Sequence, residues 1–241
     1  MKINTLLLLL GVSLSAAVFA GEVNIVTAES TIVAPPTDSA ADDGCRLTVK
    51  PGLMHTNVGS IVEGENSKVQ NAPSLLYGAS ISANWDYMQK DGWTHSLGLS
   101  VGYYEGRQTS SWPSDYYMEP VKYKCSIKAV PIMLSYDFKK DISDSLAVYC
   151  GARTGAMVRD TGLYYDESVD SCTKVLPMLG LGAGIQMFTS DKWSLNLSYD
   201  FTWTFGRDAD TMTPEWYKSP VDVSKSHRYY GTIGFGVSRS F

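Results

Sequence analysis

Strict alternation of apolar and polar side chains over residues 193–205 constrains this chain more than any other feature of its sequence. The odd positions are all apolar: Trp193, Leu195, Leu197, Tyr199, Phe201, Trp203 and Phe205. The even positions are small or polar: Ser194, Asn196, Ser198, Asp200, Thr202 and Thr204. Successive side chains of a β-strand point to opposite faces, so this pattern predicts one strand with an apolar and a polar face. Strands of soluble proteins are usually about 5–6 residues long, whereas a tilted membrane-crossing strand needs about 9–11.

The same alternation recurs along the chain from Cys45 onward. It predicts strands at 45–55, 75–87, 93–103, 122–138, 146–159, 179–187, 193–205 and 232–241. In the fourth of these, Lys122, Lys124 and Lys128 share their parity with the apolar residues from Val130 onward. We therefore expect a β-bulge near 129–131, where an extra residue would exchange the two faces of the strand.

The connections between these strands alternate in length. Three are short turns, at 89–92, 139–145 and 189–192. Four are long and polar, at 56–73, 106–121, 160–173 and 206–226. Short turns at one end and long loops at the other are typical of an outer-membrane barrel. The sequence thus predicts an all-β fold, an eight-stranded antiparallel up-and-down transmembrane β-barrel.

The composition of the two strand faces favours a membrane barrel over a soluble one. A soluble barrel places its apolar face inside and its polar face in water. Here the polar face is rich in glycine, as at Gly180, Gly182 and Gly184, which suits a narrow lumen. Aromatic residues such as Trp193 and Trp203 stand near the strand ends, where the two aromatic girdles of a membrane barrel lie.

The segment before Cys45 predicts export. Residues 1–20 contain Lys2, an apolar run from Leu6 and small residues before Gly21, as in a signal peptide. A membrane anchor is the alternative, but the apolar run is shorter than the roughly 20 residues that a spanning helix needs. Residues 21–44 are small, polar and proline-bearing, which predicts a flexible periplasmic linker. The barrel would then occupy 45–241.

Three stretches resemble the small outer-membrane β-barrel proteins of the OmpA/OmpX/opacity type, which are porin-like in fold. These are residues 129–138, residues 149–155 and the final strand 232–241. The resemblance implies a cell outer-membrane location, contact with outer-membrane lipid, and recognition of the terminal Phe241 by the barrel-assembly machinery. Arg239 departs from the family pattern, in which an apolar residue is usual at that position. The family includes structural anchors, adhesins, small channels and a few lipid-modifying enzymes.

Six charged residues fall on the predicted lumen face of their strands. They are Arg46, Lys50, Asp86, Arg153, Arg159 and Asp200. Unpaired charges would be costly in a narrow lumen, so these side chains should pair or meet water. They would form either an ion path or a polar plug. The width of an eight-stranded barrel favours the plug, whereas the glycine-rich wall favours open space.

Four cysteines in an exported chain suggest two disulfides. Cys125 and Cys172 both fall at the external end, and we expect them to bond and join the second and third long loops. Cys45 and Cys150 both fall near the periplasmic end, but on strands that are not neighbours. A bond between them would require the linker to cross the barrel mouth, so the connectivity stays open.

No motif in the sequence predicts catalysis, a cofactor or a metal site. His55 and His227 could meet at the outer rim, and His95-Ser96 resembles a lipid A deacylase pair only faintly. The net charge of -5 gives no reason to expect a nucleic-acid partner. We therefore predict a non-enzymatic surface protein whose long loops, with Trp112 and Trp216, bind an external ligand or surface. A narrow channel for small solutes and a lipid-modifying enzyme are the alternatives.

Overall fold

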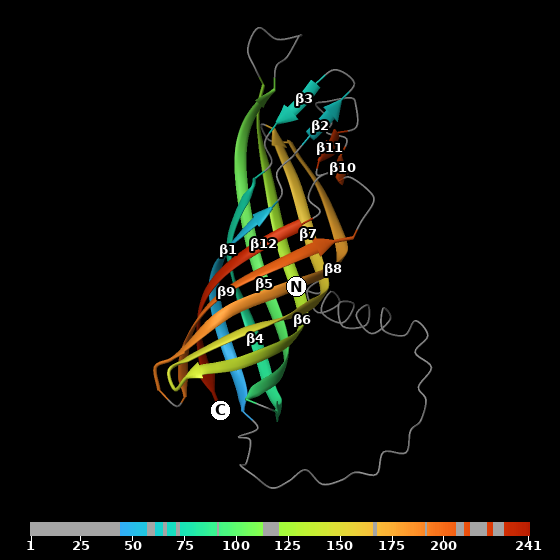
Figure 1. Ribbon diagram of the computed structural model, residues 1–241. Coiled ribbons are helices and arrows are strands. Elements are labelled where there is room, and N and C mark those ends of the chain that lie inside the picture. The colour runs from blue at the N-terminus through green and yellow to red at the C-terminus, as the bar shows by residue number, and fades with distance from the viewer. Residues whose placement is uncertain are drawn as a thin grey trace, which may run out of the picture.

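The predicted barrel is confirmed by a computed structural model. It describes residues 44–56, 61–64, 67–70, 73–90, 92–112, 121–165, 168–190, 192–205, 210–212, 221–223 and 229–241. The strands of the barrel are β1 (Cys45–Thr56), β4 (Leu75–Lys90), β5 (Trp93–Trp112), β6 (Val121–Ser143), β7 (Leu146–Tyr165), β8 (Ser168–Phe188), β9 (Trp193–Thr204) and β12 (Tyr229–Ser240). Each pairs antiparallel with the next along the chain, and β12 pairs with β1 to close the ring (Figure 1). The signal peptide and linker predicted for 1–44 lie outside the described residues, except Gly44.

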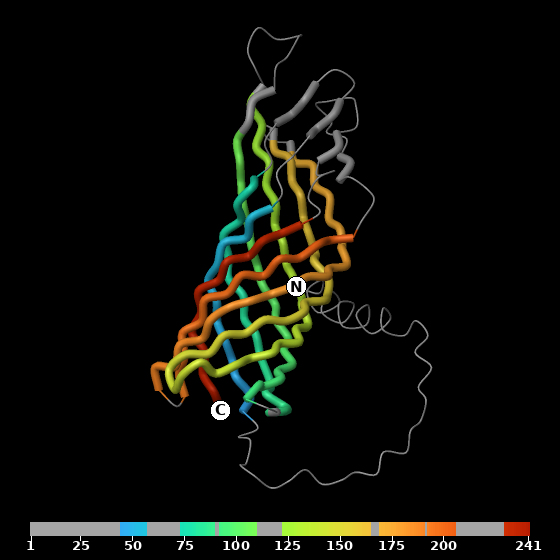
Figure 2. Tube along the Cα trace, viewed as in Figure 1, coloured from blue at the N-terminus to red at the C-terminus, as the bar shows by residue number. Residues whose placement is uncertain are grey.

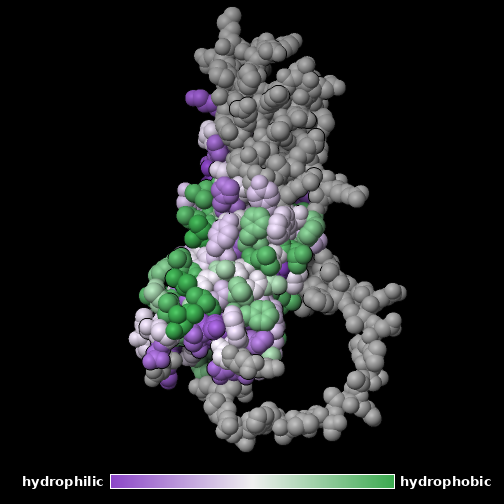
Figure 3. Space-filling view, viewed as in Figure 1, coloured by the Kyte–Doolittle hydropathy of each residue, from purple (hydrophilic) through white to green (hydrophobic). Residues whose placement is uncertain are grey.

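Alternation decides which side chains face outward. In β9 the odd positions are exposed or half-buried and the even positions are buried, as the sequence pattern predicts. The same division on the other strands leaves an apolar outer belt over the barrel wall (Figure 3). Its most exposed members include Leu47, Val49, Tyr77, Ile81, Leu97, Leu179, Leu181, Leu197, Tyr199, Ile233 and Phe235. Such a belt would be unfavourable in water, and it matches the hydrocarbon band of a bilayer.

No helix within the described ranges is long and apolar enough to span a bilayer.

Strands β5 to β8 are longer than the sequence predicted. β5 runs to Trp112 and β6 resumes at Val121, so much of the predicted loop 106–121 is paired strand. The predicted loop 160–173 is likewise built of β7 and β8, up to the register pair Tyr165 and Ser168. The four strands extend beyond β1, β9 and β12 at one end of the barrel (Figure 2). We call this the external end, and we call the end with the short turns the periplasmic end.

Two small hairpins lie beside this extension. One joins β2 (Ile61–Gly64) to β3 (Ser67–Gln70), and the other joins β10 (Asp210–Met212) to β11 (Val221–Val223). β3 lies next to β5, β10 next to β8, and β11 next to β2. The external end is therefore a small β-structured platform.

The bulge expected near 129–131 is not present. β6 keeps one register against β7 from Lys124 to Asp141, and its odd positions point inward throughout. Cys125, Ile127 and Ala129 are thus buried, while Lys122 and Lys124 point outward. Lys122 and Lys124 can point outward without a bulge in β6, because they lie beyond the apolar belt, where the outer surface of the barrel is polar. Register shifts occur instead at Asp86/Met88 in β4 and at Asp141/Ser143 in β6.

The lumen has two chemically different halves. An apolar cluster fills the external half, and it consists of Met54, Leu76, Tyr104, Tyr123, Cys125, Ile127, Ala129, Met157, Leu163, Met178 and Tyr230. All of these residues are at most 3% exposed. Polar and charged side chains fill the periplasmic half, and they form the site described next.

Candidate functional site in the barrel lumen

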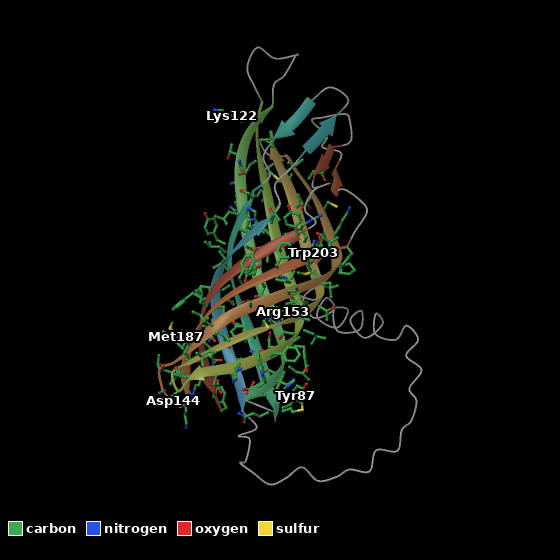
Figure 4. All side chains as sticks on the ribbon, viewed as in Figure 1. Tyr87, Lys122, Asp144, Arg153, Met187 and Trp203 are labelled. Atoms are coloured by element: carbon green, nitrogen blue, oxygen red, sulfur yellow. The ribbon has the colours of Figure 1, made fainter. Side chains whose placement is uncertain are left out.

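Arg153 forms the centre of the first charged network. It points inward from β7 and donates from Nη1 to Asp137 Oδ1 on β6 at 2.6 Å and from Nε to Asp200 Oδ1 on β9 at 2.8 Å. The Arg153 side chain is 7% exposed, and those of Asp137 and Asp200 are 12% and 9% exposed. Gly182 of β8 lies between these strands, and a Cβ there would collide with Asp200 Oδ1 and the Arg153 guanidinium. The glycine therefore makes room for the bridge across the lumen. Figure 4 labels Arg153 near the middle of the barrel.

A second network lies toward the periplasmic end. Asp86 of β4 accepts from Arg46 Nη2 of β1 at 3.0 Å and from Lys139 Nζ of β6 at 2.9 Å. Arg46 also donates from Nη1 to Gln186 Oε1 of β8 at 2.6 Å. Asp86 occupies an inward, even position of β4 just before the register shift at Asp86/Met88, while Tyr87 points outward.

Arg159 and Lys50 are the two remaining charged residues that were predicted to face the lumen. Arg159 is buried in the external half, where its Nη1 donates to Tyr230 Oη at 3.1 Å. Lys50 of β1 lines the lumen and forms no ion pair with any residue that the structure describes. All six charged residues chosen from the sequence thus point inward. Sequence reasoning missed Asp137 and Lys139, although the odd parity of both along β6 could have shown that they face inward.

Little free space remains between these side chains. The lumen holds a cavity of about 70 Å³, bounded by Arg46 and Lys139 toward the periplasmic end and by Met54, Tyr104 and Met178 toward the external end. A water molecule occupies about 30 Å³ in the liquid, so this space suits a few waters or a small ion. It is far smaller than a continuous pore.

The two predicted disulfides are not formed, and all four cysteines are thiols. Cys125 lies on β6 opposite Leu163, and Cys172 lies on β8 opposite Thr161, so β7 separates them. Neighbouring strands are about 4.8 Å apart, which puts residues on β6 and β8 beyond the roughly 7 Å that a disulfide can span. Cys45 and Cys150 lie on β1 and β7, which are on opposite sides of the ring, and both are thiols.

The periplasmic rim of the outer surface carries aromatic and basic side chains. The Arg239 guanidinium lies 5.4 Å from the Trp193 ring and 5.1 Å from the Phe241 ring, so the one departure from the family ending is stacked between aromatic residues. The Phe241 amide donates to Cys45 O at 3.0 Å, which ties the proposed assembly signal to the first strand.

The histidines do not form a site among the described residues. His55 is exposed on β1, while His227 and Trp216 lie outside the described residues. His95 points outward on β5, where its Nδ1 lies 2.9 Å from Tyr136 Oη. No group of three or more histidine, cysteine, aspartate or glutamate side chains in the described ranges is placed to hold a metal ion.

The structure resembles solved outer-membrane barrels, although no protein-family model and no curated protein matches the sequence. A major outer membrane protein from Thermus thermophilus superposes with a TM-score of 0.53 and 12% identity, over 82% of this chain and 99% of that one. Neisserial surface protein A gives 0.47 and 14%, over 82% and 96%. The outer membrane protease OmpT from Escherichia coli gives 0.42 and 10%, over 86% and 99%.

The closed ring, the apolar belt and the likeness to the Thermus thermophilus protein define the class of fold. The chain has the fold of the small outer-membrane β-barrel proteins, as the sequence resemblance implied. At these identities the likeness concerns the fold alone. Absence of enzymatic activity therefore stays a prediction, and the finer function has to be argued from the lumen and the external platform.

Proposed function

We propose that this chain is a non-conducting outer-membrane barrel whose external platform recognises an anionic surface or ligand. The closed lumen is the observation that supports this proposal most strongly. Buried ion pairs of Arg153 cross its periplasmic half, and the apolar cluster fills its external half. A solute would have to break both layers to pass.

The external platform supplies the recognition surface. Glu105, Lys128 and Asp160 form an outward row of mixed charge immediately beyond the apolar belt on β5, β6 and β7. Beyond this row, the charged side chains at described outward positions of β5 to β8 are Arg107, Lys122 and Lys124, and all three are basic and exposed. Charge complementarity therefore favours an anionic partner.

The channel alternative is tested by conductance of the refolded full chain in a planar bilayer. Heat-dependent gel mobility first establishes that the barrel is folded. We expect a folded barrel that gives no discrete conductance steps. Discrete steps from the folded chain would contradict the closed lumen and favour the channel. A lipid-modifying activity would appear as altered lipid A mass in cells that produce the chain.

The recognition role is tested on cells that display the chain. We expect salt-sensitive binding to beads that carry dextran sulfate and none to beads that carry neutral dextran. A triple variant, Arg107→Gln with Lys122→Gln and Lys124→Gln, should lose most of this binding, because these positions hold the exposed positive charge. Lys140→Gln is the matched control, since Lys140 is exposed at the periplasmic rim over the Trp93 ring. Equal binding by the triple variant and the control would contradict the proposal.

A further inference from the structure

Lys50 is the lumen cation whose charge nothing in the described residues balances. Arg153 contacts two carboxylates, and Arg46 and Lys139 share a third, Asp86. Lys50 lines the same cavity and forms neither an ion pair nor a hydrogen bond with any described side chain. Lys50 is half-buried, and an ammonium that is partly removed from water without a counter-charge is unfavourable.

Counting the charges around the cavity gives the same result. Four cations, Arg46, Lys50, Lys139 and Arg153, line it. The carboxylates that line it or bond to these cations are Asp86, Asp137 and Asp200. Four positive charges against three negative ones leave one positive charge in excess. One monovalent anion would neutralise the described cavity.

The wall beside Lys50 is shaped to hold its side chain. A Cβ on Gly236 would collide with Lys50 Cγ, so the glycine makes room for the lysine to lie along β12. The position that a Cβ would take on Gly234 lies 3.6 Å from Lys50 Cδ and 3.3 Å from Ser198 Oγ. Lys50 Cδ and the Ser198 hydroxyl of β9 therefore flank the same point of the wall, where Ser198 Oγ also donates to Gly234 O at 3.5 Å.

Hydroxyl groups surround this point on several strands. Ser80 lies directly opposite Lys50 on β4, and Thr48, Ser82, Ser198 and Thr232 line the same cavity. An ammonium together with hydroxyl donors is a suitable ligand set for an anion. The volume of about 70 Å³ limits the ligand to a small one.

We propose that the lumen binds one small monovalent anion, of the size of chloride, beside the Lys50 ammonium and among the hydroxyl groups that line the same cavity. The anion neutralises the excess charge and holds the side chains of β1, β9 and β12 together. Anions as large as gluconate are excluded by the volume of the cavity. Binding of this kind is a property of the closed lumen, and it requires no passage of ions across the membrane.

Bromide, which scatters anomalously and replaces chloride, is the probe for the site. Crystals of the refolded full chain grown in sodium bromide should show an anomalous peak within hydrogen-bond distance of Lys50 Nζ. The peak should be absent from Lys50→Met. A lumen that contains only water next to Lys50 would overturn the proposal, as would a peak that persists in Lys50→Met.

Thermal unfolding supplies a second readout in solution. At equal ionic strength, the midpoint of the heat-dependent gel shift should be a few degrees higher in sodium chloride than in sodium gluconate, because a ligand of the folded state alone stabilises it. Lys50→Met should abolish the difference, and Lys140→Met, which removes an exposed lysine outside the lumen, should retain it. Equal midpoints of the unmodified chain in the two salts would overturn the proposal.

Discussion

At the residue scale, the Arg153 bridge shows why lumen charges are positioned by strand parity. Arg153, Asp137 and Asp200 come from β7, β6 and β9, and each occupies an inward position of its strand. Because the three side chains are almost fully buried, each depends on the others to offset its loss of hydration. The network is therefore a structural crosslink between three strands.

Replacing Arg153 with methionine should be strongly destabilising. Arg153→Met keeps an apolar stem of similar length but leaves two buried carboxylates without their cation. Removing one partner of a buried ion pair costs about 3–5 kcal/mol, so we expect a loss of that order in the free energy of unfolding. Urea titration of the barrel folded into lipid vesicles measures it.

Arg107→Met is the matched control for this measurement. Arg107 also pairs with a carboxylate, that of Glu105, but 57% of its side chain is exposed outside the barrel. Exposed ion pairs contribute about 0–1 kcal/mol, so this variant should unfold nearly as the unmodified chain does. Similar losses in both variants would contradict the assignment of Arg153 to a buried network.

The sequence predicted which charged side chains point into the lumen, but it did not predict which of them contact one another. Parity alone placed Arg46, Lys50, Asp86, Arg153, Arg159 and Asp200 inside, because the side-chain period of a strand is two. Which cation meets which carboxylate depends on the stagger between strands, and the sequence does not encode that stagger locally. The pairing of Asp86 with Arg46 and Lys139, for example, requires that β4, β1 and β6 bring these three side chains to the same level of the lumen.

At the element scale, the alternation predicted all eight strands but misjudged the external ends of three of them, β5, β7 and β8. Beyond the membrane the outward face of β5 to β8 becomes polar, as at Lys122 and Lys124, while the inward face stays apolar. Polar outward residues in a turn-rich stretch look like a loop. The same lysines led to the wrong bulge, because we took them to face the lumen when they face the external solvent.

A charge placed in the apolar belt tests the facing of β9. Leu197 is 44% exposed and points outward between the aromatic girdles. An arginine near the bilayer midplane of a barrel costs about 2–4 kcal/mol, so Leu197→Arg should lower the stability of the folded barrel by that order. Folding yield and urea midpoint in lipid vesicles measure the effect.

Thr109→Arg introduces the same side chain outside the belt. Thr109 points outward and is exposed on β5, beyond the row of Glu105 and Lys128. Exposed substitutions usually change stability by about 0.5 kcal/mol or less, so this variant should fold normally. Equal loss in both variants would show that the belt boundary is drawn in the wrong place.

At the scale of the whole molecule, closure of the ring explains several features together. Pairing of β1 with β12 leaves no free edge within the barrel wall, and it brings Phe241 next to Cys45 at the start of the first strand. Closure of the ring also explains why the predicted cysteine pairs do not form disulfides. Ring order, which is set by the number and order of strands, separates Cys125 from Cys172 and places Cys45 opposite Cys150.

An engineered disulfide between the first and last strands tests closure directly. Val49 and Val237 are register partners on β1 and β12, and both point outward. Antiparallel partners have Cα atoms about 4.5–5.5 Å apart, within the range that a disulfide spans. In a background whose native cysteines are serine, Val49→Cys with Val237→Cys should therefore crosslink on oxidation. The crosslinked barrel should resist the heat-dependent shift in gel mobility until reductant is added.

Val49→Cys with Val148→Cys is the control, because β7 lies across the ring from β1. Both cysteines again face outward, so exposure and chemistry match those of the first pair. The barrel itself separates them, and no intramolecular bond should form. If this pair crosslinked and the Val49–Val237 pair did not, the strand order of the ring would be wrong. Crosslinking of the β1–β12 pair alone would establish that the eight strands close on themselves, which the sealed lumen and the proposed anion site both require.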